Sequence, residues 1–418
     1  MRVRGFQLQL ASLVSALGCA WPSVCGAQAA LSMQEAVDRA LQRRPALKAE
    51  AERVNAAKGA RDQAGEFGNP DLLFQNENLR PGQAYARDVD TLAYITQPLD
   101  LLGKRRSRMA AAGAGVARAE EEYALARIDA VRRVSLAYWA ARGAQDARDL
   151  LQAHVDTFQR IVDYHAAQLS VGAIAEQDVL RIRLEGERLA IAANLAALAA
   201  SRARIELQKE IGEPEYGNVV LTDALDARDA MVAPVSFEQV LEQHPSVTAA
   251  RAALAEAKAR ARVQDVAARP NIAVLLGYKR TLLLDHPDGV NTAVAGVTVS
   301  LPLLDRNEGN RAAARAEVRR AQDLLEATEA DARADYETAR QEYELRRTET
   351  ATLLGPLREH AAQVAGIAQA AYTQAGTDLL RLVDAERARL DAEAAWVQGM
   401  VDYRQSIVRL EAAEGTRR

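Results

Sequence analysis

Histidine, cysteine and methionine side chains bind many metal ions, and none of these residue types forms a cluster in this sequence. The chain has 418 residues, with five histidines, two cysteines and five methionines. His154 and His165 come nearest to sharing a helix face, but the helical rise between them is roughly 16 Å, which is too long for one metal ion. We therefore expect packed or solvated histidines, with no metal site and no cofactor.

The sequence also has no arrangement that would support catalysis. It contains no GxSxG, HExxH, P-loop or dinucleotide-binding pattern. A nucleophile cannot be paired with a base, which disfavours an exported hydrolase and any other enzyme. The formal net charge of −4 is too small to indicate nucleic acid as a partner.

Two glycine turns, followed by charged residues, are the most informative polar features. Each turn ends a long helical pattern, at Val171-Gly172 and again at Gly376-Thr377. Glycine permits the left-handed conformation that reverses a helix tightly. The charged residues that follow these turns include Asp178, Asp378, Arg381 and Asp384.

The N-terminus is typical of a secretory signal peptide over residues 1–29. Arg2 and Arg4 precede an apolar run from Leu8 to Ala20, and the segment closes on small residues at Ala27 and Ala29. Its removal would take both cysteines, Cys19 and Cys25, neither of which follows a convincing lipobox. The formal charge of the mature chain would then be −4 − 2 = −6.

Internal repetition indicates how the chain is organised. Pro45 and Pro70 recur 200 residues later, and Pro98 and Gly172 recur 204 residues later as Pro302 and Gly376. We expect two equivalent repeats. The first covers residues 30–212, with strands at about 71–79 and 90–98 and a helical hairpin at about 104–212. The second covers residues 235–415 after a linker at 213–234, with strands at about 271–280 and 291–301 and a hairpin at about 308–413.

The helical segments have the spacing of coiled coils. Apolar or small residues step by three and four at 112, 116, 119, 123, 126 and 130, and again at 314, 318, 321, 325, 328 and 332. This spacing keeps one seam against a partner helix. Alanine-rich seams bury little apolar area per residue, so the helices need many neighbours, which favours an assembly. Pro356 lies inside the second long helix, where it removes a hydrogen bond and predicts a bend.

The strands alternate between apolar and polar residues. Ile272, Val274, Leu276 and Tyr278 share one face, and the same holds for residues 293, 295, 297, 299 and 301. Gln75, Glu77 and Lys279 lie on polar faces. Runs of about ten residues are long enough to cross a bilayer in a closed barrel. Four strands per chain cannot close one, so closure would need several copies; three copies supply twelve strands. Pro98 and Pro302 mark the strand-to-helix corners.

The segments QPLDLLGKRRSR (residues 97–108) and LPLLDRNEGNRAAARAE (residues 301–317) make the resemblance specific. With the repeat, the strand pairs and the glycine turns, the chain resembles the outer membrane efflux proteins, or TolC-like channels, and most closely those of cobalt–zinc–cadmium-type systems. The resemblance implies a mainly α-helical chain with a membrane β-barrel portion. A homotrimer would form a twelve-stranded outer membrane barrel continuous with a long periplasmic α-helical barrel.

The resemblance also implies partners and roles. The partners would be a periplasmic adaptor protein, an inner-membrane RND pump and outer membrane lipid. Val171, Gly172, Gly376 and Thr377 would contact the adaptor at the periplasmic tip. Asp178, Asp378, Arg381 and Asp384 are the gate candidates, with Arg381 standing where an earlier acid is common in the family.

The function expected from the sequence is therefore passive conduction of substrate, with divalent metal cations as the cargo that the resemblance favours. A drug-efflux channel and a type I secretion channel remain alternatives within the same class. A periplasmic coiled-coil structural or adaptor protein is the alternative from another class. The basic cluster Lys104–Arg108 is read either as a solvated face or as a contact with lipid head groups.

Overall fold

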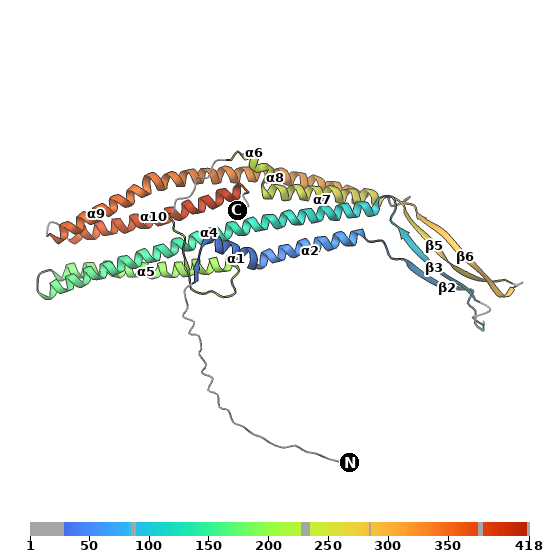
Figure 1. Ribbon diagram of the computed structural model, residues 1–418, viewed down its shortest axis with the longest axis horizontal. Helices are drawn as coiled ribbons and strands as arrows, with labels where there is room; N and C mark the ends of the chain where they lie inside the picture. The colour runs from blue at the N-terminus through green and yellow to red at the C-terminus, as the bar shows by residue number, and fades with distance from the viewer. Residues whose placement is uncertain are drawn as a thin grey trace, which may run out of the picture.

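The protein is a long layer of helices with a β-sheet at one end, as the computed structural model shows (Figure 1). The structure describes residues 29–82, 84, 89–226, 235–283, 286–374 and 379–415. The predicted signal peptide lies outside this part of the chain except for Ala29. Within it, no helix combines the length and the apolar character that crossing a membrane requires.

The order of elements repeats along the chain. The first half consists of β1 (Ala29–Leu31), α1 (Met33–Arg43), α2 (Pro45–Gly65), β2 (Asp71–Glu77), β3 (Asp90–Leu99), α4 (Lys104–Ser170) and α5 (Glu176–Ile211). The second half consists of β4 (Val219–Leu221), α6 (Phe237–Gln243), α7 (Pro245–Ala267), β5 (Asn271–Leu283), β6 (His286–Ser300), α8 (Glu308–Glu349), a π-helix (Thr350–Leu354), α9 (Gly355–Thr373) and α10 (Leu379–Ala413).

The four long strands form one antiparallel sheet in the order β2-β3-β5-β6. Its register confirms the predicted strand faces, because Ile272 pairs with Val299 and Leu276 pairs with Ala295. Leu276 also pairs with Ile95, which pairs with Leu72. This apolar row is exposed, with 61% of Leu276, 51% of Ile95 and 74% of Leu72 accessible. The outer strands β2 and β6 have no partner on their far sides within the described residues.

The opposite face of the sheet is more polar. Gln75 pairs with Leu92, Leu92 with Lys279, and Lys279 with Thr292, so the predicted polar residues share one row. A sheet that is apolar on one face and polar on the other fits a boundary between lipid and water.

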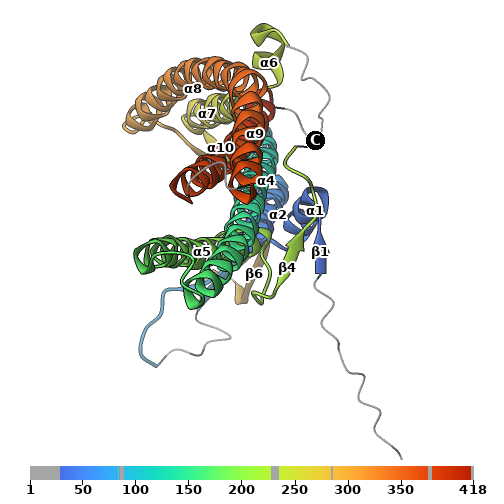
Figure 2. The ribbon, with the colours of Figure 1, turned by 90° about the vertical axis from the view of Figure 1, so that its left-hand side faces the viewer.

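The helices form a single layer in which α4 is central. Helix α4 contacts α2 and α7 on the sheet side, and α5 and α10 on the side of the hairpin tips. Helix α8 packs on α7 and α10, and α9 packs on α10. Figure 2, viewed from the hairpin tips, shows this layer with α1, β1 and β4 on one side of it.

The main core lies at mid-length, where both repeats meet. Tyr138 is fully buried, and its hydroxyl donates to the Leu31 carbonyl (3.0 Å) while accepting from the Asp223 amide (3.2 Å). The segment predicted as a linker thus contains β4, which pairs in parallel with β1. Val134, Trp139 and Met400 extend this core between α4 and α10.

The burial pattern confirms the predicted coiled-coil seam of α8. Residues 314, 318, 321, 325 and 328 are half-buried and Ala332 is buried, whereas most residues between them are exposed. In α4, Val116, Ala119 and Ala130 of the first predicted seam are buried. These seams are therefore the contacts that join neighbouring helices.

The bend predicted near Pro356 coincides with the π-helix Thr350–Leu354 (Figure 1). Proline lacks the amide hydrogen for a helical bond and its ring crowds the preceding turn, so one wider turn relieves the conflict. Thr350 donates its hydroxyl to the Arg346 carbonyl (2.9 Å), which satisfies an acceptor at the start of that turn. Helix α4, which lacks this proline, runs for 67 residues without interruption.

Candidate functional site

The first hairpin tip is a tight reversal between α4 and α5. Gly172 has φ of +73°, its amide donates to the Leu169 carbonyl (3.0 Å), and the Ala173 amide donates to the Gln168 carbonyl (3.0 Å). This pair of bonds is the Schellman arrangement that glycine favours at a helix end. Val171 is 77% exposed, so the tip presents an apolar side chain to its surroundings.

The second tip is described only on its two sides. Helix α9 ends at Thr373 and α10 begins at Leu379. Gly376, Thr377 and Asp378, which the sequence assigns to adaptor contact and to the gate, lie outside the described residues.

Arg381 and Asp384 occupy the first turns of α10 and are exposed. Asp178 is half-buried in the first turn of α5. The charged residues expected at the tip are therefore at the same end of the molecule, on both hairpins.

A polar contact behind the tips joins the two hairpins. The Tyr372 hydroxyl of α9 is hydrogen-bonded to the Nε2 atom of His165 on α4, and His165 Nδ1 is bonded to the Ile161 carbonyl (2.6 Å). Burial raises the pKa of Tyr372, and the nearby Tyr164 and the Asp178 carboxylate raise it further. His165 is only 1% exposed. Asp178 thus lies close enough to the second hairpin to act on it electrostatically.

An ion pair that the sequence reasoning missed connects the same two hairpins. Arg387 of α10 pairs with Glu185 of α5, and its guanidinium lies 4.0 Å from Asp384. The side chain of Glu185 is 14% exposed and also accepts from Arg188 on its own helix (2.9 Å). Asp384 and Arg387 are three residues apart, a spacing that predicts an ion pair within one helix. Nothing in the sequence indicated that Arg387 also reaches α5.

His154 makes another polar link between the hairpins. Its Nε2 atom lies 3.1 Å from the Glu393 carboxylate of α10, and the residue is 3% exposed. Burial alone would raise the pKa of Glu393, but hydrogen bonds from His154 and Arg389 outweigh it, so the pKa lies below its ordinary value. His154 and His165 therefore join helices of the two hairpins in separate contacts.

The corners at Pro98 and Pro302 differ in detail. Pro98 lies inside β3, one residue before its end, where it pairs with Ala273. Pro302 lies two residues beyond the end of β6. Beyond Pro98, Lys104 donates to Asn271 (2.6 Å), Arg105 donates to the Gly65 carbonyl (2.6 Å) and Arg108 pairs with Asp100. Three of the four cations of the basic cluster thus hold the corner together.

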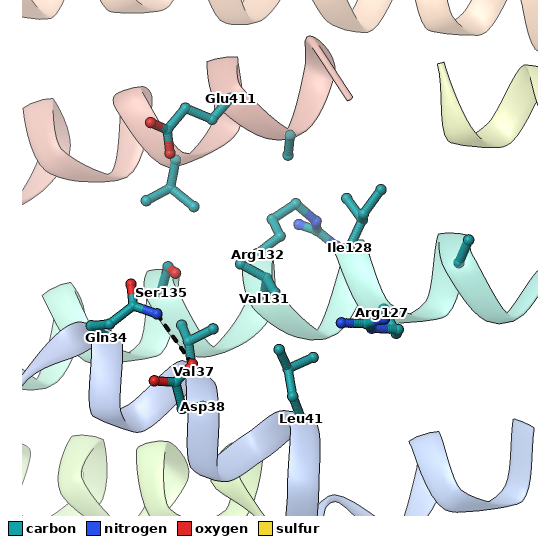
Figure 3. Close-up of a pocket in the computed structure, with 13 residues that line it drawn as sticks. Gln34, Val37, Asp38, Leu41, Arg127, Ile128, Val131, Arg132, Ser135 and Glu411 are labelled. Carbon is teal, nitrogen blue, oxygen red and sulfur yellow. Dashed lines mark hydrogen bonds between the residues drawn. The ribbon is translucent and has the colours of Figure 1, made fainter. Parts of the chain in front are cut away.

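A groove of about 230 Å³ lies between α1, α4 and α10 (Figure 3). Val37, Leu41, Ile128 and Val131 form its apolar part, while Arg132 and Glu411 extend from facing helices at its rim. The polar side chains of the groove extend from different helices and do not converge on one point. In the described part of the chain, no three His, Cys, Asp or Glu side chains gather as metal ligands would.

Comparisons with known proteins agree with this architecture. The family described as "Outer membrane efflux protein" matches residues 36–213 and 237–416. The chain is 26% identical over 353 residues to the cobalt-zinc-cadmium resistance protein CzcC of Cupriavidus metallidurans, covering 84% of this chain and 82% of that protein.

Two solved structures share the fold. The structure of CusC has a TM-score of 0.76 at 17% identity, covering 92% of both chains. The CmeC outer membrane channel of Campylobacter jejuni has a TM-score of 0.76 at 18% identity, covering 92% of this chain and 85% of that one.

Proposed function

Because the chain belongs to the outer membrane efflux protein family, we propose that it is the outer membrane channel of a tripartite efflux system. In this proposal the channel conducts substrate passively from a pump–adaptor assembly to the exterior. The hairpin tips face the periplasm, and the sheet lies in the outer membrane. The channel performs no chemistry; the energy comes from the pump.

The observation that carries the proposal is that both edges of the helical layer carry apolar stripes that no other described residue of the chain covers. Helix α5, at one edge, exposes Leu180, Leu184, Ile191, Leu195, Leu198 and Ile205. Helix α9 and the π-helix, at the other edge, expose Leu353, Leu357, Val364 and Ile367. Both sets follow coiled-coil spacing, so each is suited to pack along a long helix of another copy.

The internal repeat supports the way in which these edges would meet. Helix α10 of the second repeat packs on α4 of the first. Since α5 corresponds to α10, and α8 with α9 corresponds to α4, the equivalent contact would join α5 of one copy to α8 and α9 of the next. The same step brings β6 beside β2 of a neighbour. Three copies would supply twelve strands and twelve long helices, enough for a barrel with a lumen.

The Arg387–Glu185 ion pair, with Asp384 beside it, supports a closed state held at the periplasmic end. The pair spans from α10 to α5 across the boundary between hairpins. Moving the hairpins apart would separate these charges, so the pair favours the arrangement seen here. The Arg387 side chain is 46% exposed, so solvent screens the pair although Glu185 is only 14% exposed. An interaction of modest strength suits a contact that a partner must release.

Divalent metal cations are the proposed cargo. The support is the similarity to CzcC over most of both chains, since that protein is named for cobalt, zinc and cadmium resistance. The described residues contain no cluster that would bind such ions tightly, which fits a conduit whose selectivity resides in the pump.

Purified protein reconstituted in planar bilayers tests pore formation directly. We expect discrete conductance steps and a trimer by chemical cross-linking. Leu195→Asp, which places a charge in the α5 stripe, should abolish the trimer and the conductance. Ala197→Asp is the matched control, because residue 197 is exposed but off the stripe. A soluble monomer without conductance would contradict the proposal.

The gate has its own test. Arg387→Ala should raise the mean conductance, since it removes one of the polar links between the hairpins. Arg188→Ala should not, because Arg188 binds Glu185 from within the same helix. Equal behaviour of the two variants would show that the ion pair does not hold the closed state.

The cargo is tested in a deletion strain exposed to zinc, cobalt, cadmium, copper and a panel of drugs. We expect increased sensitivity to the metals, restored by the wild-type gene and not by the Leu195→Asp variant. Sensitivity to drugs alone would assign the channel to drug efflux instead.

A further inference from the structure

Both strand-to-helix corners carry a similar leucine-rich sequence, in which three of four residues are leucine. Leu99-Asp100-Leu101-Leu102 begins at the last residue of β3, and Leu301-Pro302-Leu303-Leu304 follows β6. A cation stands two residues after each segment, at Lys104 and Arg306. The Leu101 amide donates to the Leu99 carbonyl (2.8 Å), and the Leu303 amide donates to the Leu301 carbonyl (2.9 Å). These segments, called the leucine corners below, thus share a tight three-residue turn.

The leucine corners are unusually exposed for such apolar residues. Leu101 is 48% exposed and Leu102 is 44% exposed, while Leu303 is 69% exposed and Leu304 is completely exposed. Scattered single leucines on a surface are common, but a cluster repeated at two equivalent places suggests a partner.

The leucine corners continue the apolar face of the sheet. Leu99 pairs with Ile272, and Ile272 pairs with Val299, all in the apolar set. Leu301 follows Val299 in the same alternation. The apolar band of the sheet therefore extends past its last hydrogen-bonded pairs into both corners.

Two exposed arginines, Arg106 and Arg306, flank this apolar surface. Lys104, Arg105 and Arg108 are bonded within the protein, as described above. Arg106 and Arg306 are exposed, and no hydrogen bond or ion pair to them is found among the described residues. Arginine binds phosphate oxygens well, so the corners combine leucines for an acyl layer with guanidinium groups for phosphate.

We propose that the leucine corners insert into the periplasmic leaflet of the membrane, with Arg106 and Arg306 against phospholipid head groups. The inference rests on the proposed function, which places the sheet in the outer membrane. The first leucine corner does not lie at an edge of the sheet, because β3 stands between β2 and β5 and segments of the same chain flank the corner. Lipid is therefore the proposed cover of its exposed leucines. Arg269 donates to the Leu102 carbonyl (2.6 Å) from one side, and the Gly65 carbonyl accepts from Arg105 on the other.

Single cysteine variants labelled with a nitroxide test the inference. Cys19 and Cys25, the cysteines of the chain, lie in the predicted signal peptide, so Leu102→Cys and Leu304→Cys would each give one label on the mature protein. The probes are oxygen, which concentrates among acyl chains, and a nickel chelate, which stays in water. The vesicles contain phosphatidylethanolamine and phosphatidylglycerol. Leu324→Cys on α8, 52% exposed, is the matched control.

We expect the ratio of oxygen to nickel accessibility to be several-fold higher at both corners than at residue 324. Labels at the corners that the nickel chelate reaches as readily as at residue 324 would overturn the proposal. Labels that neither probe reaches would also overturn it, since a second copy would then cover the corners.

Conductance of the same vesicles separates this inference from the proposed function. Conducting vesicles whose corner labels face water would refute the leucine-corner contact and leave the channel intact. Lipid-facing labels without conductance, in the wild type and in the Arg387→Ala variant alike, would support the contact and refute the pore.

Discussion

The two hairpins pack closely at Gly143 of α4, which predicts that a single added methyl group destabilises the protein. A Cβ atom on Gly143 would lie 2.1 Å from Cγ2 of Val401, whereas ordinary contacts begin at 3.4 Å. Val401 is 7% exposed and belongs to the main core. Because a β-branched side chain in a helix has one preferred rotamer, Val401 cannot turn away cheaply.

The magnitude follows from opposing effects. A clash of 3.4 − 2.1 = 1.3 Å in a packed core costs about 2–3 kcal/mol, while alanine in place of glycine inside a helix gains about 1 kcal/mol. Gly143→Ala should therefore reduce the free energy of unfolding by about 1–2 kcal/mol. Gly113→Ala, on the same helix but with nothing within 4 Å, should instead raise it by about 1 kcal/mol.

A double-mutant cycle identifies the contact itself. Val401→Ala removes the clashing methyl and costs about 2 kcal/mol alone. Combined with Gly143→Ala, it should cost less than the sum of the single changes by about 2 kcal/mol. The assay is thermal unfolding of the detergent-solubilised protein followed by far-UV circular dichroism at one scan rate. Equal stability of the Gly143→Ala and Gly113→Ala variants, or additive effects in the cycle, would refute the packing described here.

Three further outcomes are expected. Gly172→Ala should cost about 1 kcal/mol, because an L-residue is strained at positive φ, and should speed hydrogen exchange of the amides at the first tip. The lowered pKa of Glu393 means that its contribution to stability is present above the ordinary value of 4.5 and is lost as pH falls through the lower folded value. The unfolding midpoints of the wild type and Glu393→Gln should therefore converge in acid. Glu256→Ala should cost only about 1 kcal/mol in urea unfolding, since its partners Arg118 and Arg260 remain 41% and 70% exposed.

The periodic parts of the fold could be predicted because apolar residues at a regular spacing share one face of a strand or of a helix. The alternation of Ile272, Val274 and Leu276 determined which face of β5 is apolar, and the register with Val299 and Ala295 confirms it. The steps along α8 identified its seam. Pro356 predicted the bend, although the sequence did not indicate that a π-helix would form it.

Contacts between distant helices were beyond the reach of the sequence because each depends on a single side chain. Glu256 of α7 is 6% exposed and binds Arg118 of α4, lying close to Gly115. The reach of Arg387 to Glu185 is of the same kind. Such pairs have no periodicity, and alanine-rich helices offer many alternative rotations that satisfy the same apolar pattern.

The π-helix Thr350–Leu354 makes the two repeats mechanically unequal. Helix α4 is a stiff rod of 67 residues, while its counterpart has a joint between α8 and α9. A joint concentrates bending at one level and leaves the segments beyond it straight, so the second hairpin can swing where the first cannot. In the proposed trimer, three compliant arms would alternate with three rigid struts. Dilation of the periplasmic end would then proceed with threefold rather than sixfold symmetry, although the wall is built from six similar hairpins.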